Sequence, residues 1–155
     1  MLMVTSGVAA SLCYLAATGL QLQRMLKGSG TDGWVKLLAA LAIILHGFTA
    51  YKGFINTSGY DLGIYPMLSL MSLSIGAIVL ISSLRRPVDN LFVFVFPLAI
   101  STIILQIVLK GDYTPLQDIT GGIFSHIALS VIAYSLLTIA AAQALLLSFG
   151  DNMLR

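Results

Sequence analysis

The chain has 155 residues, of which 58% are hydrophobic and only 9% are charged, and its mean hydropathy is +0.98. Soluble domains carry about 25% charged residues, so this composition excludes an ordinary soluble domain and predicts an integral membrane protein. The net charge of +2 comes from scattered basic residues that never form a run longer than two. That pattern argues against a nucleic-acid partner.

Five apolar segments follow one another along the chain, each near the ~20 residues that a transmembrane helix needs. We expect helices at approximately 2–22, 34–54, 62–84, 91–109 and 123–149. The first segment lacks the positively charged region that begins a signal peptide, so it is expected to remain as a helix. The sequence therefore predicts one all-α domain over residues 1–155, an integral membrane bundle of five transmembrane helices.

The orientation of the bundle is predicted from its basic residues, because Lys and Arg near the spans are retained on the cytoplasmic side. Six of them fall at alternate connections or at the C-terminus: Arg24, Lys27, Lys36, Arg85, Arg86 and Arg155. Only Lys52 and Lys110 fall on the other side. The N-terminus is therefore predicted outside and the C-terminus in the cytoplasm, with membrane lipid around the helices.

Only two histidines occur, His46 in the second apolar segment and His126 in the fifth. An ionisable side chain at membrane depth usually faces the bundle interior, pairs with another group or lines a functional site. At 1.5 Å per residue, His126 lies about 5 Å from the outer start of its helix and His46 about 12 Å from the outer end of its own. Both are predicted in the outer half of the membrane, where neighbouring helices would let them bind one ligand.

The two histidines lie on helical faces of different character. Positions one and two turns from His46 hold small residues, which permit close approach by another helix or a flat ligand. These residues are Ala39, Ala42, Thr49, Ala50 and Gly53. On the fifth helix, His126, Ser130, Tyr134 and Thr138 recur at every fourth residue. They form a polar stripe down one side of the helix.

A second interpretation of these residues needs no ligand. A transmembrane His often hydrogen-bonds a neighbouring helix, and Ser or Thr side chains commonly pack helices together; Ser69, Ser72 and Gly76 on the third helix are predicted to do so. A small transporter that uses the polar stripe as a relay is a third hypothesis. Catalysis is not expected, because the chain has no Glu and its six Asp residues lie in connections or at the C-terminal end, which leaves no catalytic constellation.

Residues 126–145 resemble a family signature. The helix opens with His126, continues through Leu-Ser and Tyr134, and ends in an Ala-rich run before the cytoplasm. In this it is similar to the cytochrome c assembly protein family, and within it to the bacterial inner-membrane branch of YpjD-like and HemX-like proteins. The His46-Gly dipeptide and the Ser-rich third span followed by Arg are also similar. Members of that branch continue through further spans, so the chain is expected to correspond to an N-terminal five-helix portion.

The resemblance implies a non-catalytic role in cytochrome c-type biogenesis, with haem as the cofactor and other cytochrome c maturation proteins as partners. His46 and His126 would inherit the role of axial ligands to haem iron, with Ser130 and Tyr134 beside them. Neutral imidazole is a standard axial ligand, and apolar walls favour the macrocycle. The resemblance also implies a multi-pass protein of the bacterial cytoplasmic (inner) membrane. The alternative remains a structural or interaction subunit that associates through its helices.

Overall fold

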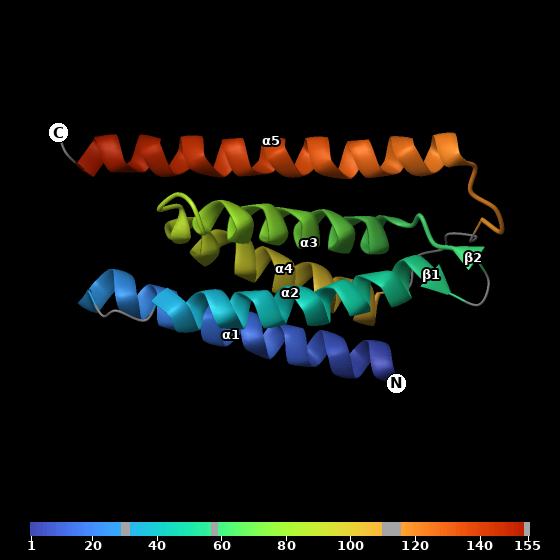
Figure 1. Ribbon diagram of the computed structural model, residues 1–155, viewed down its shortest axis with the longest axis horizontal. Helices are drawn as coiled ribbons and strands as arrows, with labels where there is room; N and C mark the ends of the chain where they lie inside the picture. Colours follow the sequence, from blue (N-terminus) through green and yellow to red (C-terminus); the bar gives the residue numbers. More distant parts are fainter. Residues whose placement is uncertain (29–31, 57–58, 110–115, 154–155) are drawn as a thin grey trace.

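The computed structural model describes residues 1–28, 32–56, 59–109 and 116–153, and these contain five long helices (Figure 1). They are α1 (Leu2–Lys27), α2 (Asp32–Phe54), α3 (Ile64–Ser83), α4 (Phe92–Val108) and α5 (Gly121–Met153). All five are long and apolar enough to cross a membrane. The predicted all-α bundle of five transmembrane helices is confirmed.

Two helices extend beyond their predicted C-terminal ends. α1 continues to Lys27 instead of ending near residue 22, because Gly28 adopts a left-handed conformation with φ of 65° and its N–H donates to the Arg24 carbonyl. Glycine takes this conformation without the steric penalty of a side chain. α5 extends to Met153, beyond the predicted end at residue 149. Both extensions lie at the same end of the molecule, past the apolar part of each helix.

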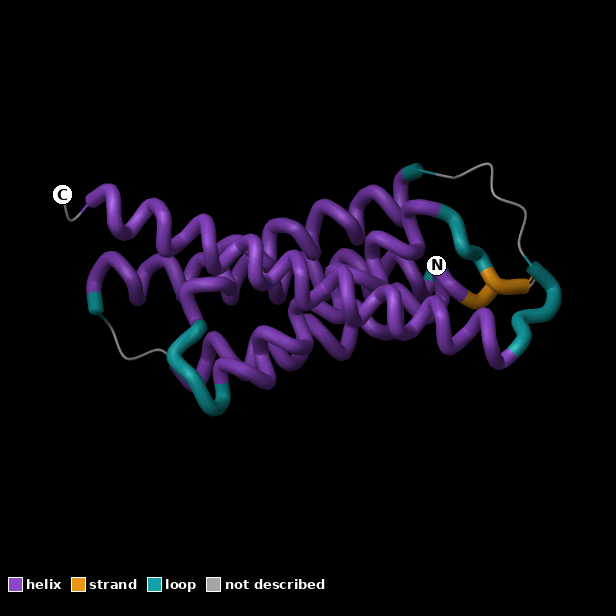
Figure 2. Tube along the Cα trace, turned by 90° about the horizontal axis from the view of Figure 1, so that it is seen from above, coloured by secondary structure: helices purple, strands orange, loops and turns teal. Residues whose placement is uncertain are grey.

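The connections gather at two ends of the molecule, as both views show (Figures 1 and 2). The N-terminus, the α2–α3 connection and the start of α5 lie at what we call the outer end, following the predicted orientation. The start of α2, the α3–α4 turn and the end of α5 lie at the inner end. All five helices therefore run between the same two ends, as membrane-crossing helices must.

A small patch of β-structure covers the outer end. β1 (Ile55–Asn56) and β2 (Gly59–Tyr60) form an antiparallel hairpin between α2 and α3. Tyr60 exchanges backbone hydrogen bonds of 2.8 and 3.0 Å with Leu116, which precedes α5. Gly59 has a φ of 125°, and a Cβ at this position would run into the Leu116 carbonyl, so this position requires glycine. The sequence predicted only a connection here; the pairing ties two connections together.

The first four helices form a bundle, and α5 lies outside it (Figure 1). α1 packs against α2 and α4, and α3 packs against the same two helices. α5 packs chiefly against α3. Among the described side chains of α5, Ser135 alone is buried, and its hydroxyl donates to the Met71 carbonyl at 3.3 Å. Four helices therefore enclose the core, whereas α5 is attached along one face.

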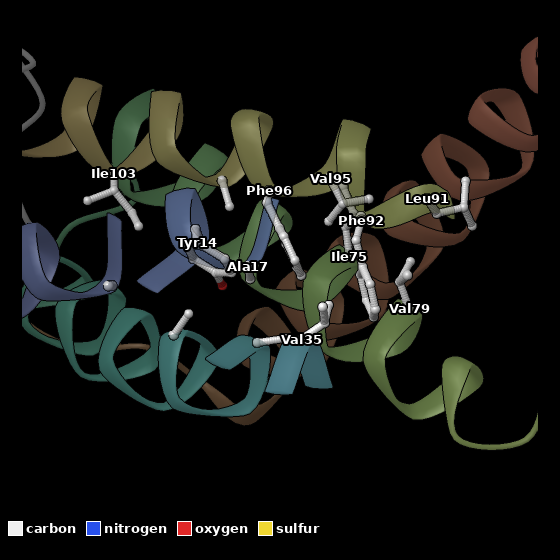
Figure 3. Packing of buried hydrophobic residues seen from close by; sticks show 14 residues of the cluster. Tyr14, Ala17, Val35, Ile75, Val79, Leu91, Phe92, Val95, Phe96 and Ile103 are labelled. Atoms are coloured by element: carbon white, nitrogen blue, oxygen red, sulfur yellow. The ribbon is translucent and has the colours of Figure 1, made fainter. Parts of the chain in front are cut away.

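Apolar side chains fill the inner half of the four-helix bundle and continue to Ile103 in its outer half (Figure 3). The rings of Phe92 and Phe96 stack with centroids 4.7 Å apart, and the Tyr14 ring lies 5.1 Å from that of Phe96. Val35 and Val79 are buried beside them. Because lipid is as apolar as these side chains, close packing rather than the hydrophobic effect holds such helices together.

The small residues predicted to permit close approach on α2 do lie in helix contacts. Ala39, Ala42 and Thr49 are fully buried, on the helix that packs most extensively against α1. Gly53 lies so close to α4 that the Gln106 amide occupies the space where a Cβ would be. The predicted close approach of another helix is confirmed, and the helices concerned are α1 and α4.

Charged groups tie the helices at the inner end. Asp89 lies in a short 3-10 helix, η1 (Asp89–Leu91), that leads into α4. Its carboxylate is 3.4 Å from Arg24 of α1 and 3.7 Å from Lys36 of α2. Lys36 also donates to the Ser83 carbonyl at the end of α3, at 3.1 Å. These contacts connect all four helices of the bundle at the cytoplasmic end predicted from the basic residues.

Candidate functional site

His46 is fully buried in the outer half of the bundle. Its Nδ1 lies 3.3 Å from the hydroxyl of Tyr14 on α1, and its Nε2 lies 3.0 Å from the hydroxyl of Ser69 on α3. The Tyr14 and His46 rings meet edge to face, at 89° with centroids 5.9 Å apart. A neutral imidazole has one donor and one acceptor nitrogen, so these two hydroxyls satisfy both. His46 thereby links three helices.

Further polar side chains surround His46 at similar depth. Ser72 and Thr102 hydrogen-bond across the α3–α4 contact at 2.6 Å, and Ser6 and Thr49 do so across the α1–α2 contact at 2.8 Å. With the histidine and its two partners they form what we call the outer polar cluster. Its members are Ser6, Tyr14, His46, Thr49, Ser69, Ser72 and Thr102. Each of the four bundle helices contributes to it, so these hydrogen bonds also determine which helix faces pack against each other. Ser69 and Ser72 are packing residues, as predicted.

Gln106 lies at the outer edge of the cluster with an unsatisfied side chain. It is 7% exposed, and both atoms of its amide group are buried without a hydrogen-bond partner among the described residues. Its amide lies against Gly53 of α2. A buried polar group without a partner is costly, and a water molecule is the smallest partner that satisfies one.

His126 has the opposite environment. It lies on α5, is exposed, and makes no side-chain hydrogen bond or ion pair with any described residue. The α5 face toward α3 carries Ile127, Val131 and Ser135 instead. Tyr134 is 57% exposed, and Ser130 is half-buried. Because His126, Ser130 and Tyr134 recur every fourth residue, their stripe lies along the side of α5 that the bundle leaves open.

The structure does not bring the two histidines to one site. His46 points into the bundle toward α1 and α3, whereas His126 lies on α5, which packs on the outside of α3. Neighbouring helices would have let His46 and His126 of one folded chain bind one ligand, but this arrangement does not place them together. Their roles as haem ligands, and those of Ser130 and Tyr134 beside them, remain predictions.

An apolar cavity of about 490 Å³ lies at the outer end between α2, α3 and α5. Its walls include Tyr51 and Phe54 of α2, Leu70 of α3, and Phe124 and Val131 of α5. Its size is within the range of small-molecule sites. Neither histidine contributes to its wall, so it has the apolar surface that a flat ligand needs but no imidazole from the described residues.

The residues that sequence reasoning missed include Tyr14, Thr102 and Gln106, together with Ser6 of the outer polar cluster. Each is a polar side chain in the middle or outer part of an otherwise apolar span, which is the same signal that singled out the histidines. What the sequence lacked was their partners: the His46 imidazole, the Ser72 hydroxyl and the close approach of Gly53. These contacts join residues that are 30 or more positions apart.

The chain is similar to the inner membrane protein YpjD of Escherichia coli. The K12, O6:H1 and O157:H7 forms are each 27% identical to it over 151 residues, which cover 94% of this chain and 57% of theirs. The chain thus spans just over half the length of these curated relatives. No family model matches the sequence, and no solved structure matches it. The five candidate spans and this similarity support a multi-pass inner membrane protein that is similar to YpjD.

Proposed function

We propose that the protein handles haem during cytochrome c-type biogenesis and that His126 is its accessible axial ligand. The observation that supports this role is an imidazole on the membrane-embedded surface of α5, exposed and unpartnered among the described residues. Such a nitrogen is available to iron without breaking an existing contact. The similarity of the His126 helix to cytochrome c assembly proteins points to haem as the source of that iron.

The residues around His126 suit a porphyrin edge. Leu129 and Tyr134 lie one and two turns along α5 and are 67% and 57% exposed. Haem supplies a redox-active iron when it is bound, and the apolar surroundings and the axial ligands adjust its potential. One face of one helix cannot enclose a macrocycle, so the proposal requires a second surface from a maturation partner or from further membrane segments. The second axial ligand would come from that surface.

His46 fits a ligand role poorly in the folded arrangement, because Tyr14 and Ser69 occupy both ring nitrogens. The proposal therefore separates the two histidines that the sequence had paired. His46 holds the bundle together, and His126 faces a ligand or partner. Ser130 and Tyr134 would flank the ligand on the same stripe.

The test is the haem content of the purified membrane protein, measured by the Soret band and as haem per protein. We expect His126→Ala to lose most of the bound haem and His46→Ala to retain it in the fraction that stays folded. Size-exclusion chromatography of both variants provides the control for folding. Equal haem content in wild type and His126→Ala would remove His126 as the ligand, and loss confined to His46→Ala would assign the ligand to the bundle interior.

A non-catalytic interaction subunit is the second candidate, and the position of the polar stripe favours it. His126, Ser130 and Tyr134 lie on a helix that is attached to the bundle along one face only. Polar groups on an open transmembrane surface are stabilised when another helix covers and hydrogen-bonds them. This candidate predicts no Soret band in any variant, together with loss of a co-purifying membrane partner when the stripe is replaced by Leu.

A further inference from the structure

The α3–α4 turn at the inner end places two arginines at the mouth of a cavity. Arg85 and Arg86 both donate their backbone N–H groups to the Ser82 carbonyl, at 3.1 and 2.9 Å. Together with Ile81, Ser82, Val88 and Gln143, they line a cavity of about 460 Å³ between this turn and α5. The cavity lies on the side of the membrane that the basic residues assign to the cytoplasm.

The two guanidinium groups differ from the other cations at this end of the bundle. Arg24 and Lys36 are paired with the Asp89 carboxylate. Arg85 and Arg86 are exposed and form no ion pair with any described residue. The Gln143 side chain, on the α5 side of the cavity, is also exposed and has no hydrogen-bond partner among the residues described. The mouth therefore presents two positive charges and an amide that are available to a ligand.

Two further spaces lined mainly by apolar residues adjoin this cavity, one at the inner end and one toward the membrane centre. A second cavity of about 260 Å³ shares Val88 and Gln143 with the first and is otherwise lined mainly by Leu91, Leu146 and Leu147. A narrower space of about 50 Å³ shares Leu91 with the second and continues between α4 and α5. These spaces exist because α5 packs chiefly against α3 and leaves the flank of α4 open.

This combination of charge, apolar surface and membrane depth matches one class of ligand. Guanidinium groups bind phosphate through paired N–H donors, and basic pockets between helices on the cytoplasmic side suit anionic lipid headgroups. The apolar spaces between the phosphate position and the membrane centre fit an acyl chain, which a soluble phosphate compound lacks. We propose that this site binds an anionic phospholipid of the inner leaflet, with the phosphate at Arg85 and Arg86 and an acyl chain between α4 and α5.

The proposal is independent of haem handling, because the site lies at the end of α5 opposite to His126. The experiment uses the full chain in nanodiscs made of equal parts phosphatidylcholine and phosphatidylglycerol. Native mass spectrometry after gentle release then measures which lipid the protein retains. We expect phosphatidylglycerol to be retained in preference to phosphatidylcholine. A hydrogen bond to a charged group contributes about tenfold in affinity, so Arg85→Gln with Arg86→Gln is expected to reduce the preference by more than tenfold.

Three further variants separate binding from orientation, since the same arginines also direct insertion. Arg85→Lys with Arg86→Lys keeps the topological charge while losing paired donation, and we expect an intermediate preference. Gln143→Leu leaves both arginines in place and is expected to weaken retention by a few-fold. Lys27→Gln removes an exposed charge at the same end, outside the cavities, and is the matched control. A C-terminal reporter confirms that each variant has the wild-type orientation.

The outcomes decide the proposal clearly. Loss of phosphatidylglycerol preference in the Gln double variant, but not in Lys27→Gln, supports the site. Equal retention in wild type and the double variant overturns it, as does an equal effect of Lys27→Gln, which would indicate general surface attraction. Displacement of the retained lipid by millimolar glycerol 3-phosphate would also overturn it, because the apolar spaces would then contribute nothing.

Discussion

The contrasting environments of the two histidines lead to a sharp comparison between His46→Leu and His126→Leu. Both variants replace an imidazole in a transmembrane helix by the same apolar side chain of similar size. At His46 the change removes hydrogen bonds to Tyr14 and Ser69, both fully buried. At His126 it removes no hydrogen bond or ion pair with a described residue. The pair therefore isolates the contribution of the buried contacts.

The expected loss of stability depends on the two hydrogen-bond partners, Tyr14 and Ser69, that His46→Leu leaves behind. A hydrogen bond between transmembrane helices contributes about 0.6 kcal/mol on average and up to about 1.7 kcal/mol. Ser69 can turn its hydroxyl to a carbonyl of its own helix, whereas the Tyr14 hydroxyl is left buried without its partner, which costs about 1–3 kcal/mol. We expect His46→Leu to lower the free energy of unfolding by about 2–3 kcal/mol. His126→Leu is expected to change the free energy of unfolding by less than about 0.5 kcal/mol, because an exposed side chain has similar surroundings in the folded and unfolded states.

The assay is reversible unfolding in bicelles or mixed micelles, followed by SDS titration or steric trapping. Tyr14→Phe alone and combined with His46→Leu completes a double-mutant cycle, in which we expect a coupling of about 1 kcal/mol. A loss at His126 equal to that at His46 would refute the assignment of His46 as the buried link. So would strict additivity of the Tyr14 and His46 variants, because the hydrogen bond would then contribute nothing.

Two further predictions concern the ends of the bundle. Gly59→Ala places a Cβ against the Leu116 carbonyl at a residue with φ of 125°, so we expect the hairpin to lose about 1–3 kcal/mol of local stability. The loss is measured as faster amide hydrogen exchange in the hairpin while the helices stay protected. Unchanged exchange would contradict the strand pairing. Asp89→Asn removes the carboxylate charge shared by Arg24 and Lys36. We expect the free energy of unfolding to fall by up to about 1 kcal/mol, and the loss to become smaller as the salt concentration rises. A loss independent of salt would indicate a hydrogen-bonding role instead.

Helix number and position were readable from the sequence because a membrane imposes them. A span must satisfy its backbone internally and cover the hydrocarbon thickness, so each apolar segment of about 20 residues became a helix close to its predicted place. The small residues on α2 were equally informative, since close helix approach requires them. Ala39 and Ala42 are buried where this face predicted a contact.

Helix adjacency was not readable, because it depends on pairwise contacts between distant segments. His46 and His126 are predicted in the same half of the membrane, and their depth alone left open whether their helices are neighbours. The contacts that decide the arrangement are local matches such as Ser72 with Thr102 and the close approach of Gly53 to Gln106. Neither leaves a periodic signal in the sequence. Strand pairing between Tyr60 and Leu116 was hidden for the same reason.

The distribution of polar groups separates the molecule into two parts with different roles. In the first four helices, polar side chains of the outer half find partners within the bundle, so they specify one arrangement and leave little for a ligand except at Gln106. On α5 the polar stripe has no such partners among the described residues, and the helix is attached along one face. A transmembrane helix with this pattern gains stability only when something covers its open side. A ligand or partner is therefore expected on α5, at His126, whereas His46 serves to hold the bundle together.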